Sequence, residues 1–207
     1  MIEYNTGNME KYGSRNPLKQ FMIKKFLAKL FEVLQGFNRE APMSLLDVGC
    51  GEGFIANFLY DNLADTQITA CDFFYEALIK AKEGNTRSIC FEQADIMMLK
   101  YPENSYDVVI ATEVLEHLEN PKKALAELMR VARRAVVVSV PSEPFFCLGN
   151  LACGKNIKRL GNPIDHINHW TYGGFKRFLR GNIQGGVSIA EYNCLVWTLA
   201  VIQKDEN

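Results

Sequence analysis

The chain has 207 residues, of which 48% are hydrophobic and 23% charged, and its 23 Lys and Arg against 24 Asp and Glu give a formal net charge of -1. These values predict a globular domain with its own core and exclude collagen-like, low-complexity and wholly disordered chains. No apolar run approaches the roughly 20 residues that cross a bilayer, and no signal peptide is visible at the start, so we expect a cytoplasmic protein without a transmembrane segment. The near-neutral charge argues against a nucleic-acid partner.

The first predicted element is an amphipathic helix over residues 18–36. Its apolar positions recur at helical spacing with lysines on the opposite face, and Gly36 is a plausible stop signal. We expect this helix to cover the core of the domain. The chain is therefore divided into an N-terminal helical segment, residues 1–41, and a main domain, residues 42–207.

The main domain alternates short apolar runs with amphipathic stretches. Strands are expected at residues 44–48, 68–71, 88–93, 106–112 and 135–140, and helices at 54–63, 75–82 and 121–132. This alternation predicts an α/β fold with a mostly parallel sheet covered by helices on both faces. Residues 141–170 are too long for a simple connection and are expected to form a lid or insertion.

Two further β-like runs, residues 186–192 and 195–202, follow a short helix at 171–182. Only Asn193 marks their separation in this interpretation, so we expect a tight hairpin and an antiparallel last strand. The complete prediction is a seven-stranded, Rossmann-like sheet. Ligands of such sheets bind beyond the carboxyl ends of the strands.

A glycine-rich turn, Asp47-Val48-Gly49-Cys50-Gly51-Glu52-Gly53, follows the first strand. Asp72 ends the second strand and can accept both hydroxyls of a ribose. Asp95 and Ile96 follow the third strand and suit the amine and ring of an adenine. Phe54 stands where a nicotinamide-binding turn needs glycine, and Asp47 suits an ammonium or sulfonium group better than a pyrophosphate. The pattern therefore favours S-adenosylmethionine over NAD.

The stretches LLDVGCGEGF, ITACDFFYEAL, EQADI and YDVVIATEVLEHLENP resemble the class I S-adenosylmethionine-dependent methyltransferases. The resemblance implies a methyltransferase of Rossmann-like fold with S-adenosylmethionine as cofactor. It implies that the glycine turn holds the methionine part, that the acid after the second strand holds the ribose, and that the acid after the third holds the adenine. The cofactor-binding residues implied are Asp47, Gly49, Gly51, Gly53, Asp72, Phe73, Asp95 and Ile96.

A cluster of acids and histidines follows the fourth strand and recurs in the predicted lid. Glu113, Glu116 and His117 have the spacing of one helical face, and the lid contains His166 and His169. Three interpretations stay open for these residues: ligands of a divalent metal, a metal-free acid/base or positioning role, and a structural role. The candidate catalytic residues are Glu113, His117, His166 and His169; the candidate metal ligands are Glu113, Glu116, His117 and His166.

The same cluster resembles an E-x-x-E-H turn found in ubiquinone-pathway O-methyltransferases and in metal-dependent small-RNA 2′-O-methyltransferases. The lid is rich in apolar residues and has one modest basic cluster. We therefore expect methyl transfer to an oxygen of a small-molecule or lipid-like acceptor, with a divalent metal possible but not expected. The alternatives are metal-dependent methylation of an RNA 2′-hydroxyl and a noncatalytic subunit that binds the cofactor.

Overall fold

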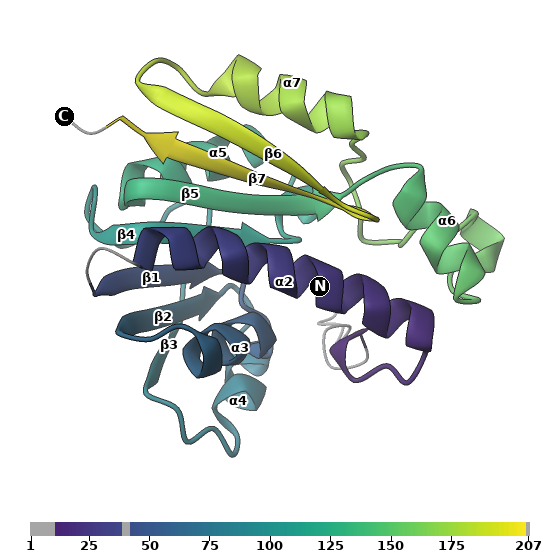
Figure 1. Ribbon diagram of the computed structural model, residues 1–207, viewed down its shortest axis with the longest axis horizontal. Coiled ribbons are helices and arrows are strands. Elements are labelled where there is room, and N and C mark those ends of the chain that lie inside the picture. The colour runs from purple at the N-terminus through teal and green to yellow at the C-terminus, as the bar shows by residue number, and fades with distance from the viewer. Residues whose placement is uncertain (1–10, 39–41, 206–207) are drawn as a thin grey trace.

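The computed structural model of the protein describes residues 11–38 and 42–205. Its centre is a seven-stranded sheet in the order β3-β2-β1-β4-β5-β7-β6 (Figure 1). The strands, in chain order, are β1 (Met43–Val48), β2 (Thr66–Asp72), β3 (Ile89–Gln93), β4 (Tyr106–Thr112), β5 (Ala132–Pro141), β6 (Val187–Cys194) and β7 (Trp197–Lys204).

The strand directions confirm the predicted class I topology. β1 pairs in parallel with β2 and β4, β2 with β3, and β4 with β5. β7 runs antiparallel to both of its neighbours, β5 and β6. The sheet is therefore parallel except for its last strand in the chain, as the sequence predicts.

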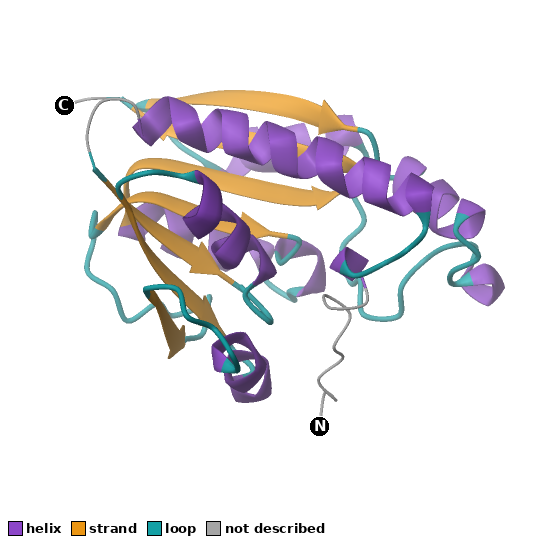
Figure 2. Ribbon diagram, turned by 60° about the horizontal axis from the view of Figure 1, so that its bottom comes forward, coloured by secondary structure: helices purple, strands orange, loops and turns teal. Residues whose placement is uncertain are grey.

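Helices cover both faces of the sheet (Figures 1 and 2). They are α2 (Pro17–Asn38), α3 (Phe54–Asn62), α4 (Tyr75–Lys82), α5 (Pro121–Val131), α6 (Phe145–Ala152) and α7 (Tyr172–Asn182), with short 3-10 turns η1 (Leu115–His117) and η2 (Ile157–Arg159). Buried residues of α2, α3 and α4 share one core cluster with the sheet, whereas those of α5 and α7 share the other. This two-sided burial explains why the central strands are almost continuously apolar.

Helix α2 packs closely on one face of the sheet. Phe26, Leu30 and Leu34 are fully buried and lie in the same cluster as Leu45 and Val108 of the central strands. Each such side chain removed from water contributes about 1.5–3 kcal/mol. The helix continues through Gly36 to Asn38, and Gly36 does not adopt the left-handed conformation that is common in glycines at helix ends.

The hairpin between β6 and β7 corrects one detail of the prediction. Asn193 lies within β6 and pairs with Thr198, whereas Leu195 and Val196 form the turn. Leu195 has φ 66°, a left-handed conformation in which asparagine is more common than leucine. The preference of asparagine for turns therefore pointed to the wrong residue.

The chain order places the candidate ligand-binding crevice above β1 and β4. From β1 the chain moves outward through β2 and β3, then returns to β4 on the other side of β1. Such a reversal leaves an opening at the carboxyl ends of the two central strands. Among the residues that the structure describes, no helix combines the length and apolar character needed to span a bilayer.

Candidate functional site

The glycine turn after β1 is a left-handed loop that packs against protein as well as facing the crevice. Gly49, Gly51 and Gly53 have φ of 76°, 55° and 76°. The amides of Gly49 and Cys50 both donate to the carbonyl of Cys71, at 2.8 and 3.0 Å, which ties the turn to β2. A Cβ on Gly49 would lie 2.4 Å from a methyl of Val114. Protein packing therefore demands glycine here independently of any ligand.

Gly49→Ala is expected to lower the free energy of unfolding by about 2–4 kcal/mol, because left-handed strain adds to the Val114 clash. Urea denaturation measures the loss. Gly84→Ala is the matched control: Gly84 also has a positive φ, 65°, but no atom lies within 4 Å of its added Cβ. The double variant Gly49→Ala/Val114→Ala should relieve the clash but keep the left-handed strain. Equal losses at both glycines would contradict the packing argument.

Asp47 lies beneath this turn as an unpaired buried carboxylate. Asp47 is only 1% exposed, and neither of its carboxylate oxygens has a hydrogen-bond partner. Burial, with a smaller contribution from Asp72, raises the pKa of Asp47 to about 7. It lines a pocket whose other walls include Gly49, Phe54 and Glu113. A cationic group entering this pocket would supply the missing partner.

Asp72 has a structural role that the sequence did not predict. One carboxylate oxygen accepts from the amide of Gly51 at 2.7 Å, and the other accepts from the amide of Phe74 at 2.9 Å. Burial raises the pKa of Asp72, while these backbone donors oppose that rise. The carboxylate therefore holds the glycine turn in place, and its other lone pairs are the ones left for a ligand.

The residues after β3 divide into buried and exposed groups. Ile96 is buried and joins the core cluster of the α5 face. Asp95 is exposed, and one of its oxygens accepts from the amide of Met97 at 2.8 Å. Met98 is also exposed. Phe73, a predicted cofactor residue that follows β2, is likewise exposed and has a face open to solvent.

The segment before α2 covers one side of the pocket. Tyr12 lines it and stacks on Phe54, with ring centroids 3.7 Å apart and nearly parallel planes. Lys11 forms an ion pair with Glu113, and its ammonium lies 4.8 Å from the centroid of a Trp197 ring. Sequence reasoning missed Lys11, because its partner is 102 positions away and no local pattern connects them.

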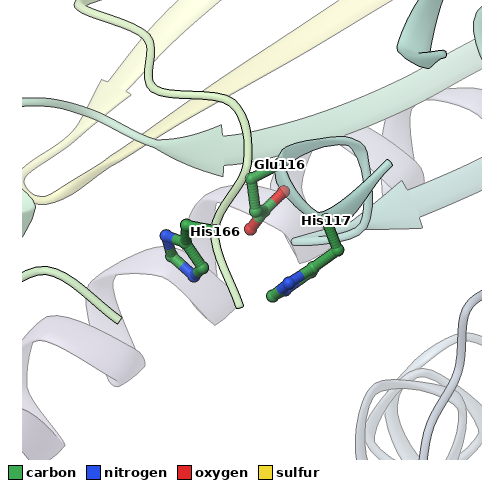
Figure 3. Close-up of side chains that lie close together, drawn as sticks. All are labelled: Glu116, His117 and His166. Atoms are coloured by element: carbon green, nitrogen blue, oxygen red, sulfur yellow. The ribbon is translucent and has the colours of Figure 1, made fainter. Parts of the chain in front are cut away.

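Three of the predicted chemistry-bearing residues converge beside the η1 turn (Figure 3). Each of Glu116, His117 and His166 offers a ligand atom, and these atoms lie within 4.8 Å of one another. Glu116 is 1% exposed with no partner on either carboxylate oxygen, and burial, followed by Glu113, raises its pKa well above the ordinary value. Glu113 itself pairs with Lys11 instead of joining the three.

Hydrogen bonds tie residues 165–168, part of the predicted lid, to η1. The carbonyl of Glu116 accepts from the amides of Ile167 and Asn168, at 2.8 and 2.9 Å. The side-chain amide of Asn168 donates to the carbonyls of Leu115 and Leu118. These contacts hold residues 165–168 against the end of β4, at the crevice where the site was predicted.

His117 is oriented by Asp165, a residue to which sequence analysis gave no role. The Nδ1 of His117 lies 3.0 Å from the carbonyl oxygen of Asp165 and 3.3 Å from its carboxylate. Because an Nδ1–H that donates to these oxygens fixes the tautomer, Nε2 is left as the proton acceptor. The arrangement is that of an oriented base.

The two lid histidines differ in their surroundings. His166 packs against His117, with ring centroids 4.9 Å apart, and against Phe146 of α6 at 5.5 Å. Burial, followed by the charge of a protonated His117, lowers the pKa of His166 to about 4, so its imidazole is neutral at pH 7. His169 is exposed, and its ring centroid lies 6.4 Å from that of His166.

Comparison with known protein families identifies the central part of the chain. Residues 46–139 match the methyltransferase domain family. Over 98 residues the chain is 38% identical to a ubiquinone/menaquinone biosynthesis C-methyltransferase of Bdellovibrio bacteriovorus, covering 45% of this chain and 41% of that protein. It is 29% identical over 109 residues to a malonyl-[acyl-carrier protein] O-methyltransferase of Bacillus cereus, covering 52% of this chain and 40% of that protein. The chain thus spans about two fifths of the length of these relatives.

Solved structures share the fold over nearly the whole chain. The magnesium protoporphyrin IX methyltransferase of Synechocystis, solved with S-adenosylhomocysteine, superposes with a TM-score of 0.70 at 17% identity, covering 96% of this chain and 92% of that one. A methyltransferase from Aquifex aeolicus superposes with a TM-score of 0.65 at 17% identity, covering 97% and 98%. Residues 46–139 therefore carry a methyltransferase domain, and nearly the whole chain shares the fold of solved S-adenosylmethionine-dependent methyltransferases.

Proposed function

We propose that this protein transfers a methyl group from S-adenosylmethionine to an oxygen of a small-molecule or lipid-like acceptor. The observation that carries the proposal is Asp47, a buried carboxylate without a partner at the floor of a pocket beside the glycine turn. A buried charge without a partner is costly, so it marks a place where a cationic ligand group supplies the missing interaction.

The residues at the carboxyl ends of β1, β2 and β3 fit this cofactor. Asp47 would hold the amino group of the methionine part, and Gly49, which also lines the pocket, adds no side chain there. Asp72 would hold the ribose with the lone pairs that its two backbone contacts leave. Asp95 and the exposed ring of Phe73 would contact the adenine, with Ile96 beneath it.

When bound, S-adenosylmethionine supplies a methyl group on a positively charged sulfur. In the transfer, the acceptor oxygen would form a bond to the methyl carbon as the carbon–sulfur bond breaks. The electron pair of the broken bond would stay on the sulfur of S-adenosylhomocysteine. The proton of the acceptor hydroxyl must pass to a base. The protein's task is to align the acceptor, exclude water and accept this proton.

His117 is the residue best arranged to accept the proton. Its Nδ1 is held by Asp165, which directs Nε2 to act as acceptor. His166 is a weaker base, because its pKa is lowered to about 4. We assign His166 to contact with the acceptor, together with Phe146, on which it packs. His169 is exposed and receives no role in this scheme.

A second candidate is metal-assisted transfer, including transfer to an RNA 2′-hydroxyl. It is favoured by the ligand atoms of Glu116, His117 and His166, which lie within 4.8 Å of one another. It is also favoured by the two buried carboxylate oxygens of Glu116, which have no hydrogen-bond partner. Two imidazoles and a carboxylate suit several divalent metals. Against a four-ligand site, the carboxylate of Glu113 is engaged by Lys11.

Release of S-adenosylhomocysteine is the readout that separates these functions. With a panel of phenols, carboxylic acids, fatty alcohols and single-stranded RNA, we expect turnover with an apolar hydroxyl compound and no change after dialysis against excess EDTA. Loss of activity with EDTA, restored by Mg²⁺, Mn²⁺ or Co²⁺, would establish the metal-assisted reaction instead. Cofactor binding without turnover on any acceptor in the panel would favour a noncatalytic subunit.

A further inference from the structure

We propose that one end of the molecule docks on an anionic lipid surface. This docking end consists of residues 17–25, the first turns of α2, and residues 145–164, which include α6 and η2. The proposal concerns where the protein works, and it does not depend on the methyl-transfer reaction.

Exposed apolar side chains concentrate at the docking end. The described part of the chain has thirteen large hydrophobic residues that are exposed, and seven of them lie here. Leu160 and Ile164 are 78% and 80% exposed, and neither α6 nor η2 has a buried residue. A surface helix normally buries one apolar face, so this grouping marks an interaction surface. The seven residues are Leu18, Phe21, Phe145, Leu148, Ile157, Leu160 and Ile164.

The two segments of the docking end lie side by side. A Cβ on Gly149 of α6 would be 3.9 Å from the sulfur of Met22 of α2 and 3.2 Å from Val196 in the β6–β7 turn. Both ribbon views place the start of α2 next to α6 at one end of the molecule (Figures 1 and 2). Leu195, also exposed, lies in the same turn and extends the apolar surface.

The charge of the docking end is opposite to that of the rest of the chain. The end contains six of the 23 basic residues and none of the 24 acidic residues, so the remainder has a net charge of -7. Lys25 lies over the ring of Phe21, at 5.8 Å, and Lys158 and Arg159 are exposed between Ile157 and Leu160. Basic and apolar side chains that alternate in this way match the headgroup region of an anionic bilayer.

These features favour a lipid surface over nucleic acid. Phosphate backbones are bound by basic side chains and bases by aromatic ones, whereas five of the seven exposed apolar residues here are aliphatic and only Phe21 and Phe145 are aromatic. The docking end also adjoins the candidate site, because Phe146 of α6 packs on His166. An acceptor dissolved in the bilayer would therefore have a short path to the histidine cluster.

Co-sedimentation of the full chain with vesicles tests the proposal. We expect binding to vesicles with about one third phosphatidylglycerol, and at least about tenfold weaker binding to pure phosphatidylcholine vesicles. Lys158→Glu/Arg159→Glu should weaken binding to the anionic vesicles at least about tenfold, and Leu160→Ser/Ile164→Ser should also weaken it. All four side chains are exposed, so the variants should fold normally.

Matched variants on other surfaces are the controls. Lys122→Glu/Lys123→Glu makes the same change of charge at exposed positions on α5, and Ile79→Ser removes an exposed apolar residue from α4. Both should bind vesicles like the parent protein. Equal binding to anionic and neutral vesicles, or equal loss in the control variants, would overturn the proposal. So would binding of single-stranded RNA, lost in Lys158→Glu/Arg159→Glu, with no binding to vesicles.

Discussion

Replacing His117 by alanine is expected to lower the turnover of methyl transfer by about 10²–10⁴-fold, with little change in affinity for S-adenosylmethionine. The reason is that His117 is the base that we propose, and contacts of its Nδ1 with Asp165 fix its tautomer. Single-turnover rates on an acceptor found in the panel, together with calorimetry for the cofactor, measure both quantities.

His169→Ala is the matched control, because His169 comes from the same cluster but is exposed. It should leave turnover within about twofold of the parent enzyme. Asp165→Ala retains the backbone carbonyl that lies 3.0 Å from Nδ1, so its loss of turnover should be smaller than that of His117→Ala. Unchanged turnover in His117→Ala, or a loss explained wholly by weaker cofactor binding, would contradict the assignment.

Asp47→Asn is expected to weaken S-adenosylmethionine binding by on the order of 10²–10³-fold and, at the same time, to stabilise the ligand-free protein above pH 7. Binding weakens because the cationic part of the cofactor loses its buried partner. Stability rises because an unpaired buried carboxylate is replaced by a neutral amide. A residue that is only structural would not give these opposite effects.

The pH dependence of stability tests the same residue. The folded-state pKa of Asp47 is about 7, above its ordinary value of 3.8, so the folded protein binds this proton more tightly than the unfolded chain. The contribution of Asp47 to stability is therefore complete below about pH 4 and is lost as pH rises to about 7, by roughly 4 kcal/mol. In urea denaturation, Asp47→Asn should show a smaller decline than the parent protein, because only the contributions of Asp72 and Glu116, whose pKa values burial also raises, remain.

Asp61→Asn provides the control for this measurement. Asp61 is an exposed carboxylate paired with Arg87, so its replacement should change stability little and should leave the decline in place. The account of Asp47 fails if the parent protein and Asp47→Asn lose stability equally between pH 4 and 7.

Much of the fold follows from local sequence patterns. The strands of the parallel sheet are short apolar runs between amphipathic stretches, and burial on both faces makes such runs recognisable. The left-handed φ values of Gly49, Gly51 and Gly53 explain why the turn after β1 is marked by glycines. The position of the β6–β7 turn was missed because Leu195, which has no preference for turns, adopts the left-handed conformation there.

The candidate site is less predictable because distant segments complete it. Lys11 reaches Glu113 across 102 positions, and Asp165 reaches His117 across 48. Neither contact follows from periodicity or spacing, since each depends on how the N-terminal segment and the lid pack on the sheet. The second role of Asp72, accepting from the amide of Gly51, likewise depends on the tertiary position of the turn.

The central claim, that residues after β1, β2 and β3 form the S-adenosylmethionine pocket, is tested most directly by calorimetric titration of the parent protein and Asp72→Ala. We predict that the parent binds one equivalent of the cofactor and that the variant binds it about 10- to 150-fold more weakly, because the contact to the ribose is worth about 1.5–3 kcal/mol. Asp72→Asn, which preserves the shape of the side chain, should also bind more weakly, and a urea titration should show that both variants remain folded. No binding by the parent protein, or unchanged affinity in folded Asp72→Ala, would contradict the account.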